Sequence, residues 1–329
     1  MKQILMDRPG DPASVIRLAD GPEPPEPGPH QALVELVASP IHPADLLTIA
    51  GMYAASPGPM PKVPGKEGLG RVLRVGELVQ HLKPGDLVPV LLANDGVWQE
   101  RLVLEAEHLV ALPPGGDPLQ YAMGFANPAT AFLLLREVVP LGLGDWVIQN
   151  AANSSVGQFL IQLARRQGIR TINIVRREGL ADKLHQLGAD VVLVDGPELP
   201  RRVAEISAGA PIRLAIDAVA GEASARLAAC LAPRGTLCNY GMMSGKNVQV
   251  SPAALIGAGI VVRGFWLTPA LSAMTPAQRA QLFGELIALL ASGTIRAAVE
   301  ATYPFSRVHE ALAHAARGER SGKIFLVPH

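Results

Sequence analysis

The sequence predicts an α/β protein with two domains, a β-rich domain followed by a doubly wound parallel sheet. Strand-like runs among prolines and glycines fill the region before residue 120 of the 329-residue chain. From Tyr121 onwards, apolar strands alternate with amphipathic helices, which is typical of a parallel sheet covered by helices. The third observation is one strand, turn, helix and strand unit from Trp146 to Arg177.

Prolines and short apolar runs define the first domain. Thirteen prolines fall within the first 64 residues, and in sheets proline is confined to edges, bulges and strand starts. The expected strands are Ala32 to Ala38, Gly70 to Val75, Asp86 to Leu92 and Gly96 to Leu104. We therefore place a β-rich, barrel-like domain at residues 1–120.

Residues 121–268 are expected to form the parallel-sheet domain. The expected helices are Ala129 to Val138, Val156 to Gln167, Ala181 to Leu187 and Glu222 to Leu231. The expected strands are Trp146 to Gln149, Thr171 to Val175, Val191 to Val194, Leu214 to Val219, Gly235 to Tyr240 and Val261 to Gly264. Residues 269–329 carry a helix at Gln278 to Leu290, a second helix and a last strand at Lys323 to Val327, and should return to the first domain.

The turn from Asn150 to Ser155 indicates a phosphate site. A helix that begins directly after a strand presents unpaired N–H groups and partial positive charge, which suit a pyrophosphate. The usual dinucleotide fingerprint has three glycines in this turn, and only Gly157 remains here. The glycine pattern alone is therefore weak support.

Two arginines strengthen this interpretation and indicate the cofactor. An NAD-binding protein places a carboxylate at the end of the second strand, where this chain has Arg176 and Arg177. Guanidinium groups pair with a 2′-phosphate in a bidentate manner, so NADPH is favoured over NADH. The alternative is two solvated arginines after a buried strand.

Composition excludes several classes of protein. Hydrophobic residues make up 49% of the chain, enough for two cores, and 29 basic residues balance 29 acidic ones. Basic residues form only short pairs, which argues against nucleic acid as a ligand. Apolar runs such as Leu255 to Val262 are too short to span a membrane. With two cysteines and no visible transit peptide, a reducing, cytoplasmic location is expected.

Several motifs resemble the medium-chain dehydrogenase/reductase superfamily in their order and spacing. They are Asn127-Pro-Ala-Thr-Ala131, the turn unit with its Val-Arg-Arg end, Tyr240-Gly-Met-Met243 and Gly264-Phe-Trp-Leu267. Within that superfamily the chain is similar to the mitochondrial-type 2-enoyl thioester reductases. The resemblance implies a nucleotide-binding Rossmann domain and a GroES-like catalytic domain.

The metal ligands of the zinc-dependent members do not match this sequence. His42 stands in the place of their cysteine and Lys66 in the place of their histidine, and no four-cysteine cluster exists for a structural ion. Neither zinc site can assemble in the usual way. A role for His42 in a polar pocket or at the surface is favoured over metal binding.

The resemblance implies that Tyr53 is the catalytic residue, because these reductases use a tyrosine after a Pro-x-Asp turn such as Pro43-Ala-Asp45. Conjugate hydride addition pushes negative charge onto the thioester oxygen, where a phenol can donate a hydrogen bond. Tyr53 could also protonate the α-carbon, directly or through water. The alternative is a loop tyrosine that packs on Pro57 or Pro59.

The resemblance also assigns residues to the cofactor. They are Asn127, Asn153, Ser154, Ser155, Val156, Arg176, Arg177, Tyr240, Gly241, Met242, Met243, Phe265, Trp266, Leu267 and Lys323, with Trp266 also near the acyl pocket. Two departures stand out. The family's Arg-Asp-Arg is Arg176-Arg177-Glu178 here, and its Asn-Ser-Gly is Asn153-Ser154-Ser155.

The leading hypothesis is therefore an NADPH-dependent reductase of trans-2-enoyl thioesters carried by coenzyme A or acyl-carrier protein, in fatty-acid metabolism. A zinc-independent quinone or alkenal reductase is one alternative, and a non-catalytic NADPH-binding regulatory protein is another. By resemblance we expect a homodimer, with the apolar run Leu255 to Val262 at the contact. That run could equally be a buried interior strand.

Overall fold

The computed structural model describes residues 1–52, 58–92, 96–318 and 320–329. The chain divides into two compact units, which we treat separately. Unit 1 comprises residues 1–126 and 283–329, and unit 2 comprises residues 127–282. The boundaries expected from the sequence, at 120 and 268, both lie before those of the structure. The carboxyl-terminal part of the chain belongs to unit 1 from Phe283 onwards.

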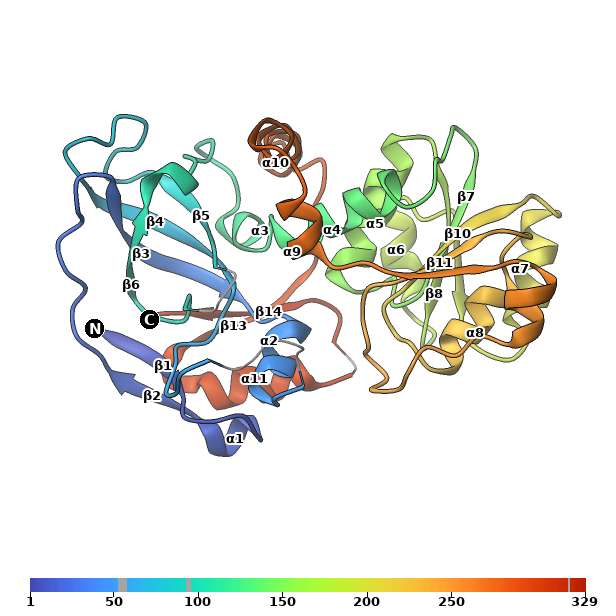
Figure 1. The fold of residues 1–329 in the computed structure, drawn as a ribbon, viewed down its shortest axis with the longest axis horizontal. Coiled ribbons are helices and arrows are strands. Elements are labelled where there is room, and N and C mark those ends of the chain that lie inside the picture. The colour runs from blue at the N-terminus through green and yellow to red at the C-terminus, as the bar shows by residue number, and fades with distance from the viewer. Residues whose placement is uncertain (53–57, 93–95, 319) are drawn as a thin grey trace. The chain divides into compact units, whose positions relative to one another are not determined.

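Unit 1 is built around a mainly antiparallel sheet (Figure 1). Its strands are β1 (Lys2–Met6), β2 (Ile16–Asp20), β3 (Gln31–Pro40), β4 (Glu67–Val75), β5 (Leu87–Leu91), β6 (Arg101–Glu105), β13 (Val299–Pro304) and β14 (Lys323–Val327). Its helices are α1 (Pro12–Val15), α2 (Pro43–Ile49), α3 (Pro118–Ala122) and α11 (Val308–Ala316), with short 3-10 turns at Ala106–His108 and Phe305–Arg307. The main sheet has the order β13-β14-β3-β4-β5, and β6 pairs with β3.

The last strand of the chain lies inside this sheet rather than at its edge. β14 pairs in parallel with β13 and antiparallel with β3, with Phe325 opposite Pro40 and Leu326 opposite Ser39. Ile324 and Leu326 are fully buried and join the unit 1 core. The predicted return of the carboxyl terminus to the β-rich domain takes this form.

One predicted strand of unit 1 is wrong over half its length. The strand expected over Gly96 to Leu104 begins only at Arg101. Val97 and Trp98 instead donate their N–H groups to the carbonyls of Gly65 and Pro64, and both side chains are buried in the core. Because these loop residues pack into the core, they are apolar, and the segment has the sequence pattern of a strand without forming one.

Unit 2 is a six-stranded parallel sheet with the order β12-β11-β10-β7-β8-β9 (Figure 1). Its strands are β7 (Trp146–Gln149), β8 (Arg170–Val175), β9 (Val191–Val194), β10 (Ile212–Asp217), β11 (Thr236–Asn239) and β12 (Val261–Gly264). Its helices are α5 (Ser155–Arg166), α6 (Ala181–Leu187), α7 (Leu199–Ser207), α8 (Glu222–Ala229) and α9 (Leu267–Ser272), with a π-helical turn at Ala253–Gly257. Helix α4 (Ala126–Arg136) begins at the last residue before unit 2, and α10 (Pro276–Ala291) ends in unit 1.

This arrangement confirms the predicted doubly wound sheet. Helices α5 and α6 contact each other, α5 contacts β8 and α6 contacts β9. Helices α7 and α8 also contact each other, and α8 packs on β10 and β11. The strand order reverses between β7 and β10, and ligands of such sheets bind beyond the carboxyl ends of the strands at this point. No helix among the described residues is long and apolar enough to cross a membrane.

Candidate active and cofactor sites

The turn between β7 and α5 exposes the first N–H groups of a helix. The Ser154 side chain caps the helix by accepting from the Gly157 N–H at 3.2 Å. Ser155 and Val156 form the first helical positions. A Cβ on Gly157 would lie 2.6 Å from the Ala152 carbonyl oxygen, so only glycine lets the helix approach the turn this closely. The geometry suits an anionic group such as a pyrophosphate.

Arg176 and Arg177 follow the carboxyl end of β8 directly. β7 and β8 are neighbouring parallel strands, with Gln149 opposite Asn173, so their carboxyl ends lie at the same edge of the sheet. Arg176 is exposed and Arg177 is half-buried. The two arginines therefore follow the strand that neighbours β7, and β7 is the strand that leads into α5.

A buried carboxylate that the sequence did not single out organises the neighbouring loops. Asp217, at the end of β10, has no exposed surface. It accepts hydrogen bonds from three side chains and two backbone N–H groups, those of Asn150 at 2.6 Å, Ser224 at 2.6 Å, Asn239 at 3.0 Å, Val219 at 2.9 Å and Ala220 at 3.0 Å. Polar residues at or just beyond the ends of three neighbouring strands were the signal that could have identified this network.

The segment from Tyr240 to Met243 follows β11 and is fixed to the same loop. Tyr240 N–H donates to the Asp217 carbonyl at 2.9 Å, and Met243 N–H donates to the Ala218 carbonyl at 3.1 Å. A Cβ on Gly241 would lie 2.7 Å from the Ala218 carbonyl oxygen, which requires glycine there. Met242 and Met243 remain exposed.

Tyr240 also contacts the turn before α5. Burial raises the pKa of its phenol, and a hydrogen bond with Ser154 opposes that rise. The phenol is therefore a neutral hydrogen-bonding group at physiological pH. The structure thus brings together two segments that the resemblance assigns to the cofactor, Asn153 to Val156 and Tyr240 to Met243.

The remaining unit 2 residues of the predicted site lie after β12 and at the start of α4. Phe265 N–H donates to the Asn239 carbonyl at 2.8 Å, Trp266 is half exposed, and Leu267 begins α9. Asn127 is buried on α4, and its Nδ2 has no hydrogen-bond partner among the described residues. A buried amide donor without a partner is costly, so a ligand acceptor would stabilise it.

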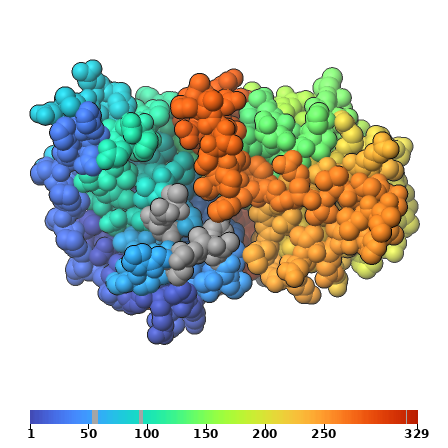
Figure 2. Space-filling model, in the orientation of Figure 1, coloured from blue at the N-terminus to red at the C-terminus, as the bar shows by residue number. Residues whose placement is uncertain are grey.

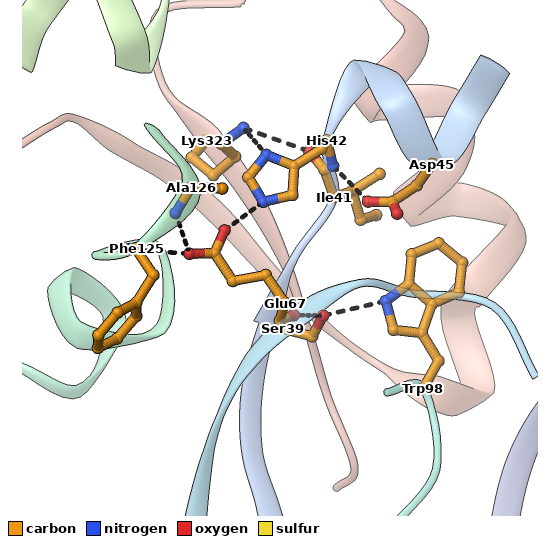
Figure 3. A network of polar contacts seen from close by, with 9 residues as sticks. All are labelled: Ser39, Ile41, His42, Asp45, Glu67, Trp98, Phe125, Ala126 and Lys323. Atoms are coloured by element: carbon orange, nitrogen blue, oxygen red, sulfur yellow. Dashed lines mark hydrogen bonds and ion pairs between the residues drawn. The ribbon is translucent and has the colours of Figure 1, made fainter. Parts of the chain in front are cut away.

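A second polar cluster lies in unit 1 (Figure 3). His42, directly before α2, places Nε2 2.5 Å from a Glu67 carboxylate oxygen at the start of β4. The other Glu67 oxygen accepts from the N–H groups of Phe125 and Ala126 at 2.9 and 2.8 Å. Lys323 Nζ lies 3.4 Å from His42 Nδ1. The sequence analysis named Lys323 and His42, but not Glu67 or the contacts that join the three residues.

Lys323 is a buried ammonium. Desolvation and the charge of Arg320 together lower its pKa to about 8, against the opposing effect of the Glu67 and Asp45 carboxylates. At neutral pH the side chain is therefore charged, but it can lose its proton within a mildly alkaline range.

The predicted catalytic residue, Tyr53, lies outside the described residues. The Pro43-Ala-Asp45 turn on which its assignment depends forms the first turn of α2, and Asp45 accepts from the His42 N–H at 2.8 Å. Lys66, in the place of the zinc-binding histidine, is half-buried next to Glu67. No group of three or more His, Cys, Asp or Glu side chains able to hold a metal occurs in the part of the chain that the structure describes.

Comparison with known proteins identifies related sequences over nearly the whole chain. Residues 28–114 match the family described as alcohol dehydrogenase GroES-like domain, and residues 155–283 match the zinc-binding dehydrogenase family. The mitochondrial enoyl-[acyl-carrier-protein] reductase of Rattus norvegicus is 36% identical over 318 residues, which cover 95% of this chain and 84% of the relative. The human protein of the same name is 35% identical over 321 residues, with 95% and 84% covered.

Solved structures include two kinds of reductase. A putative NADPH:quinone reductase from Bacillus thuringiensis has a TM-score of 0.90 at 30% identity, covering 100% of this chain and 99% of its own. The Etr1p complex with NADP and crotonyl-CoA has a TM-score of 0.88 at 26% identity, covering 99% of both chains. The Etr1p/Etr2p heterodimer of the 2-enoyl thioester reductase from Candida tropicalis has a TM-score of 0.87 at 26% identity, again covering 99% of both chains.

Proposed function

Because the chain belongs to the mitochondrial-type enoyl thioester reductases of the medium-chain dehydrogenase/reductase superfamily, we propose that it reduces the trans-2 double bond of enoyl thioesters with NADPH. The observation that carries the proposal is the set of anion-binding groups at one edge of the unit 2 sheet. There, the first N–H groups of α5 and the arginines after β8 follow neighbouring parallel strands. Pyrophosphate and 2′-phosphate are the groups that these donors suit.

The chain's own residues fit this cofactor. Gly157 keeps the helix close to the turn, and Asn127 holds a buried donor that has no partner in the described part of the chain. Asn153 to Val156 would bind the pyrophosphate, and Arg176 and Arg177 would pair with the 2′-phosphate. When bound, NADPH supplies a hydride for the β-carbon of the enoyl group.

Family resemblance assigns the proton donor to Tyr53. As negative charge develops on the thioester oxygen, a neutral phenol can donate a hydrogen bond to it without being charged beforehand. The α-carbon then takes up a proton, which Tyr53 supplies directly or through water. Trp266, half exposed after β12, is proposed to contact the acyl chain.

Zinc plays no part in the proposed reaction, although the matched family is described as zinc-binding. The reason is the chemistry of the donor set. A lysine at position 66 is a poor zinc ligand at neutral pH, and the imidazole of His42 is already paired with Glu67. One of the two matching positions therefore holds a poor ligand, and the other holds an imidazole that already has a partner.

The experiment that tests the proposal follows NADPH absorbance with crotonyl-CoA for the wild type and Tyr53→Phe. We expect turnover by the wild type and a loss of about 100-fold or more in the variant with NADPH affinity retained. Equal turnover by both proteins would exclude Tyr53 as the donor. Tight NADPH binding without oxidation of any activated alkene would instead favour a regulatory protein.

A quinone or alkenal reductase is the second candidate function. It is favoured by the similarity to the putative NADPH:quinone reductase, which at 30% identity exceeds the 26% identity of the Etr1p complex. Both reactions share hydride transfer to an electron-poor carbon. The kcat/KM for 1,4-benzoquinone, measured beside that for crotonyl-CoA, separates the two candidates.

We also propose that the protein forms a homodimer through β12. This strand is the edge of the unit 2 sheet, and Val261 and Val262 are 51% and 39% exposed. The adjoining turn adds Ile256, which is 86% exposed, and this segment lies at the surface of unit 2 (orange, Figure 2). An apolar edge strand is a template for pairing with a second copy.

Sedimentation of the wild type and Val261→Lys tests the pairing, with Val110→Lys as an exposed-valine control. An unchanged dimer in Val261→Lys would contradict it.

The preferred carrier of the acyl chain belongs to the same proposal. Coenzyme A and acyl-carrier protein present the same thioester, so the two are compared by kcat/KM with crotonyl groups on each. A higher value with acyl-carrier protein would support a role in fatty-acid synthesis.

A further inference from the structure

Lys323 is a buried ammonium with few partners. Its Nζ lies 3.5 Å from the Ile41 carbonyl oxygen and 3.4 Å from His42 Nδ1, both long for hydrogen bonds (Figure 3). An ammonium has three N–H donors, so at least one has no partner among the described residues. The side chain is held in a defined place while a donor remains available for a ligand.

His42 lies between this ammonium and a carboxylate. Glu67 Oε2 is 2.5 Å from His42 Nε2, and Glu67 Oε1 already accepts from Phe125 and Ala126. A carboxylate accepts and an ammonium donates, so the two contacts assign the imidazole proton to Nε2. Nδ1 then carries a lone pair that faces Lys323.

The backbone atoms of His42 and Glu67 make further hydrogen bonds. The His42 N–H donates to Asp45 at 2.8 Å, which fixes the start of α2. The Glu67 carbonyl accepts from Ser39 Oγ at 2.6 Å, and Ser39 Oγ accepts from Trp98 Nε1 at 3.0 Å (Figure 3). Buried hydrogen bonds therefore fix the backbone positions from which the two side chains extend.

We propose that His42 and Glu67 are positioning residues for Lys323. His42 accepts from the ammonium through Nδ1, and Glu67 fixes the tautomer that makes Nδ1 an acceptor. The inference rests on the proposed function, because Lys323 is one of the residues that the family resemblance assigns to NADPH. It extends that function to two residues that sequence reasoning left without a role in the reaction.

The charges in the cluster agree with this role. Removal of the ammonium from water disfavours its charged form, and Glu67 and Asp45 partly restore it. Arg320 acts in the opposite direction. Glu67 thus both contacts His42 and favours the charged form of Lys323.

The test uses two amides that imitate opposite sides of the imidazole. The amide of His42→Asn reaches the position of Nδ1, whereas that of His42→Gln reaches the position of Nε2. We expect His42→Ala to weaken NADPH binding by about tenfold or more. His42→Asn should restore affinity to within about threefold of the wild type, and His42→Gln should not. Rescue by Gln but not by Asn would overturn the proposal.

A double variant separates positioning from a general structural role. If His42 acts through Lys323, then His42→Ala combined with Lys323→Met should bind NADPH no more weakly than Lys323→Met alone. Additive losses would overturn the proposal. His81→Asn, a change to a histidine that bonds the Ala106 carbonyl in the same unit, is the matched control and should bind like the wild type.

Titration calorimetry of the full chain with NADPH gives these affinities without turnover. Circular dichroism confirms that each variant is folded, and His42→Asn retains a residue suited to begin α2.

Glu67→Gln should weaken NADPH binding, as His42→Ala does. Unchanged binding in this variant would overturn the part assigned to Glu67. Wild-type binding with the expected variant pattern but no reduction of crotonyl-CoA would contradict the proposed reaction alone. Absence of NADPH binding by the wild type would overturn both proposals.

Discussion

The side-chain amide of Asn150, just after β7, donates to the carboxylate of Asp217, at the end of β10, over 2.6 Å. The amide oxygen of Asn150 in turn accepts from the Ala218 N–H at 2.7 Å. These two residues therefore tie together the strands on either side of the point where the sheet order reverses. The hydrogen bonds of this pair therefore help to position the loops that carry the predicted cofactor residues.

Asp217→Ala should destabilise unit 2 by about 3 kcal/mol or more, because it leaves several buried donors without an acceptor. Urea unfolding followed by circular dichroism measures the change. Glu198→Ala, which removes an exposed ion pair with Arg201, is the control and should leave the unfolding midpoint unchanged. A wild-type midpoint for Asp217→Ala would show that the network contributes little.

Gly157→Ala should weaken NADPH binding by about tenfold or more, since its Cβ would lie 2.6 Å from the Ala152 carbonyl oxygen and displace the turn. Gly196→Ala is the matched control, because a Cβ there meets nothing within 4 Å. Isothermal titration with NADPH compares the two variants. Equal affinities would mean that the turn can shift without loss of the site.

Arg176→Ala and Arg177→Ala should each lower kcat/KM with NADPH by about tenfold or more and leave NADH kinetics nearly unchanged. The difference arises because only NADPH carries the 2′-phosphate. Arg201→Ala, on the exposed face of α7, is the control. A parallel loss with both nucleotides would indicate a structural role for the arginines.

Stability should depend on pH through Lys323. Its folded pKa, about 8, lies below the ordinary value of 10.5, so the unfolded chain binds more protons between these values. The free energy of unfolding attributable to Lys323 therefore rises with pH across that window. Lys323→Met should be more stable than the wild type below pH 8, and this advantage should shrink towards pH 10.5. Denaturation at several pH values, with the exposed Lys183→Met as a control, checks the trend, and a constant advantage would contradict it.

Local patterns explain most of what the sequence predicted correctly. Ala181–Leu187, Val191–Val194 and Val261–Gly264 have the predicted bounds, because apolar periodicity and flanking glycines define them locally. The unit β7, α5 and β8 was recognisable for the same reason. Helix α7 was missed because Pro200 and its charged residues obscure the pattern.

Long-range contacts account for what the sequence could not predict. Asp217 and Asn150 are 67 residues apart, and Lys323 and His42 are 281 residues apart. The strand-end positions of Asn150 and Asp217 offered a signal for the first pair, whereas nothing in the sequence indicates that Lys323 and His42 meet. Family resemblance named Lys323 as a cofactor residue. The contacts of Lys323 with His42, and of His42 with Glu67, are visible only in the folded structure.

The position of β14 inside the unit 1 sheet sets an order for folding during synthesis. All of unit 2 is translated before β14, and its six strands come from one continuous stretch of chain. Unit 2 can therefore assemble while the chain is still growing. The first 126 residues, although made earlier, must wait for residues 323–327 to complete their sheet. The domain that is begun first is thus the one that is finished last.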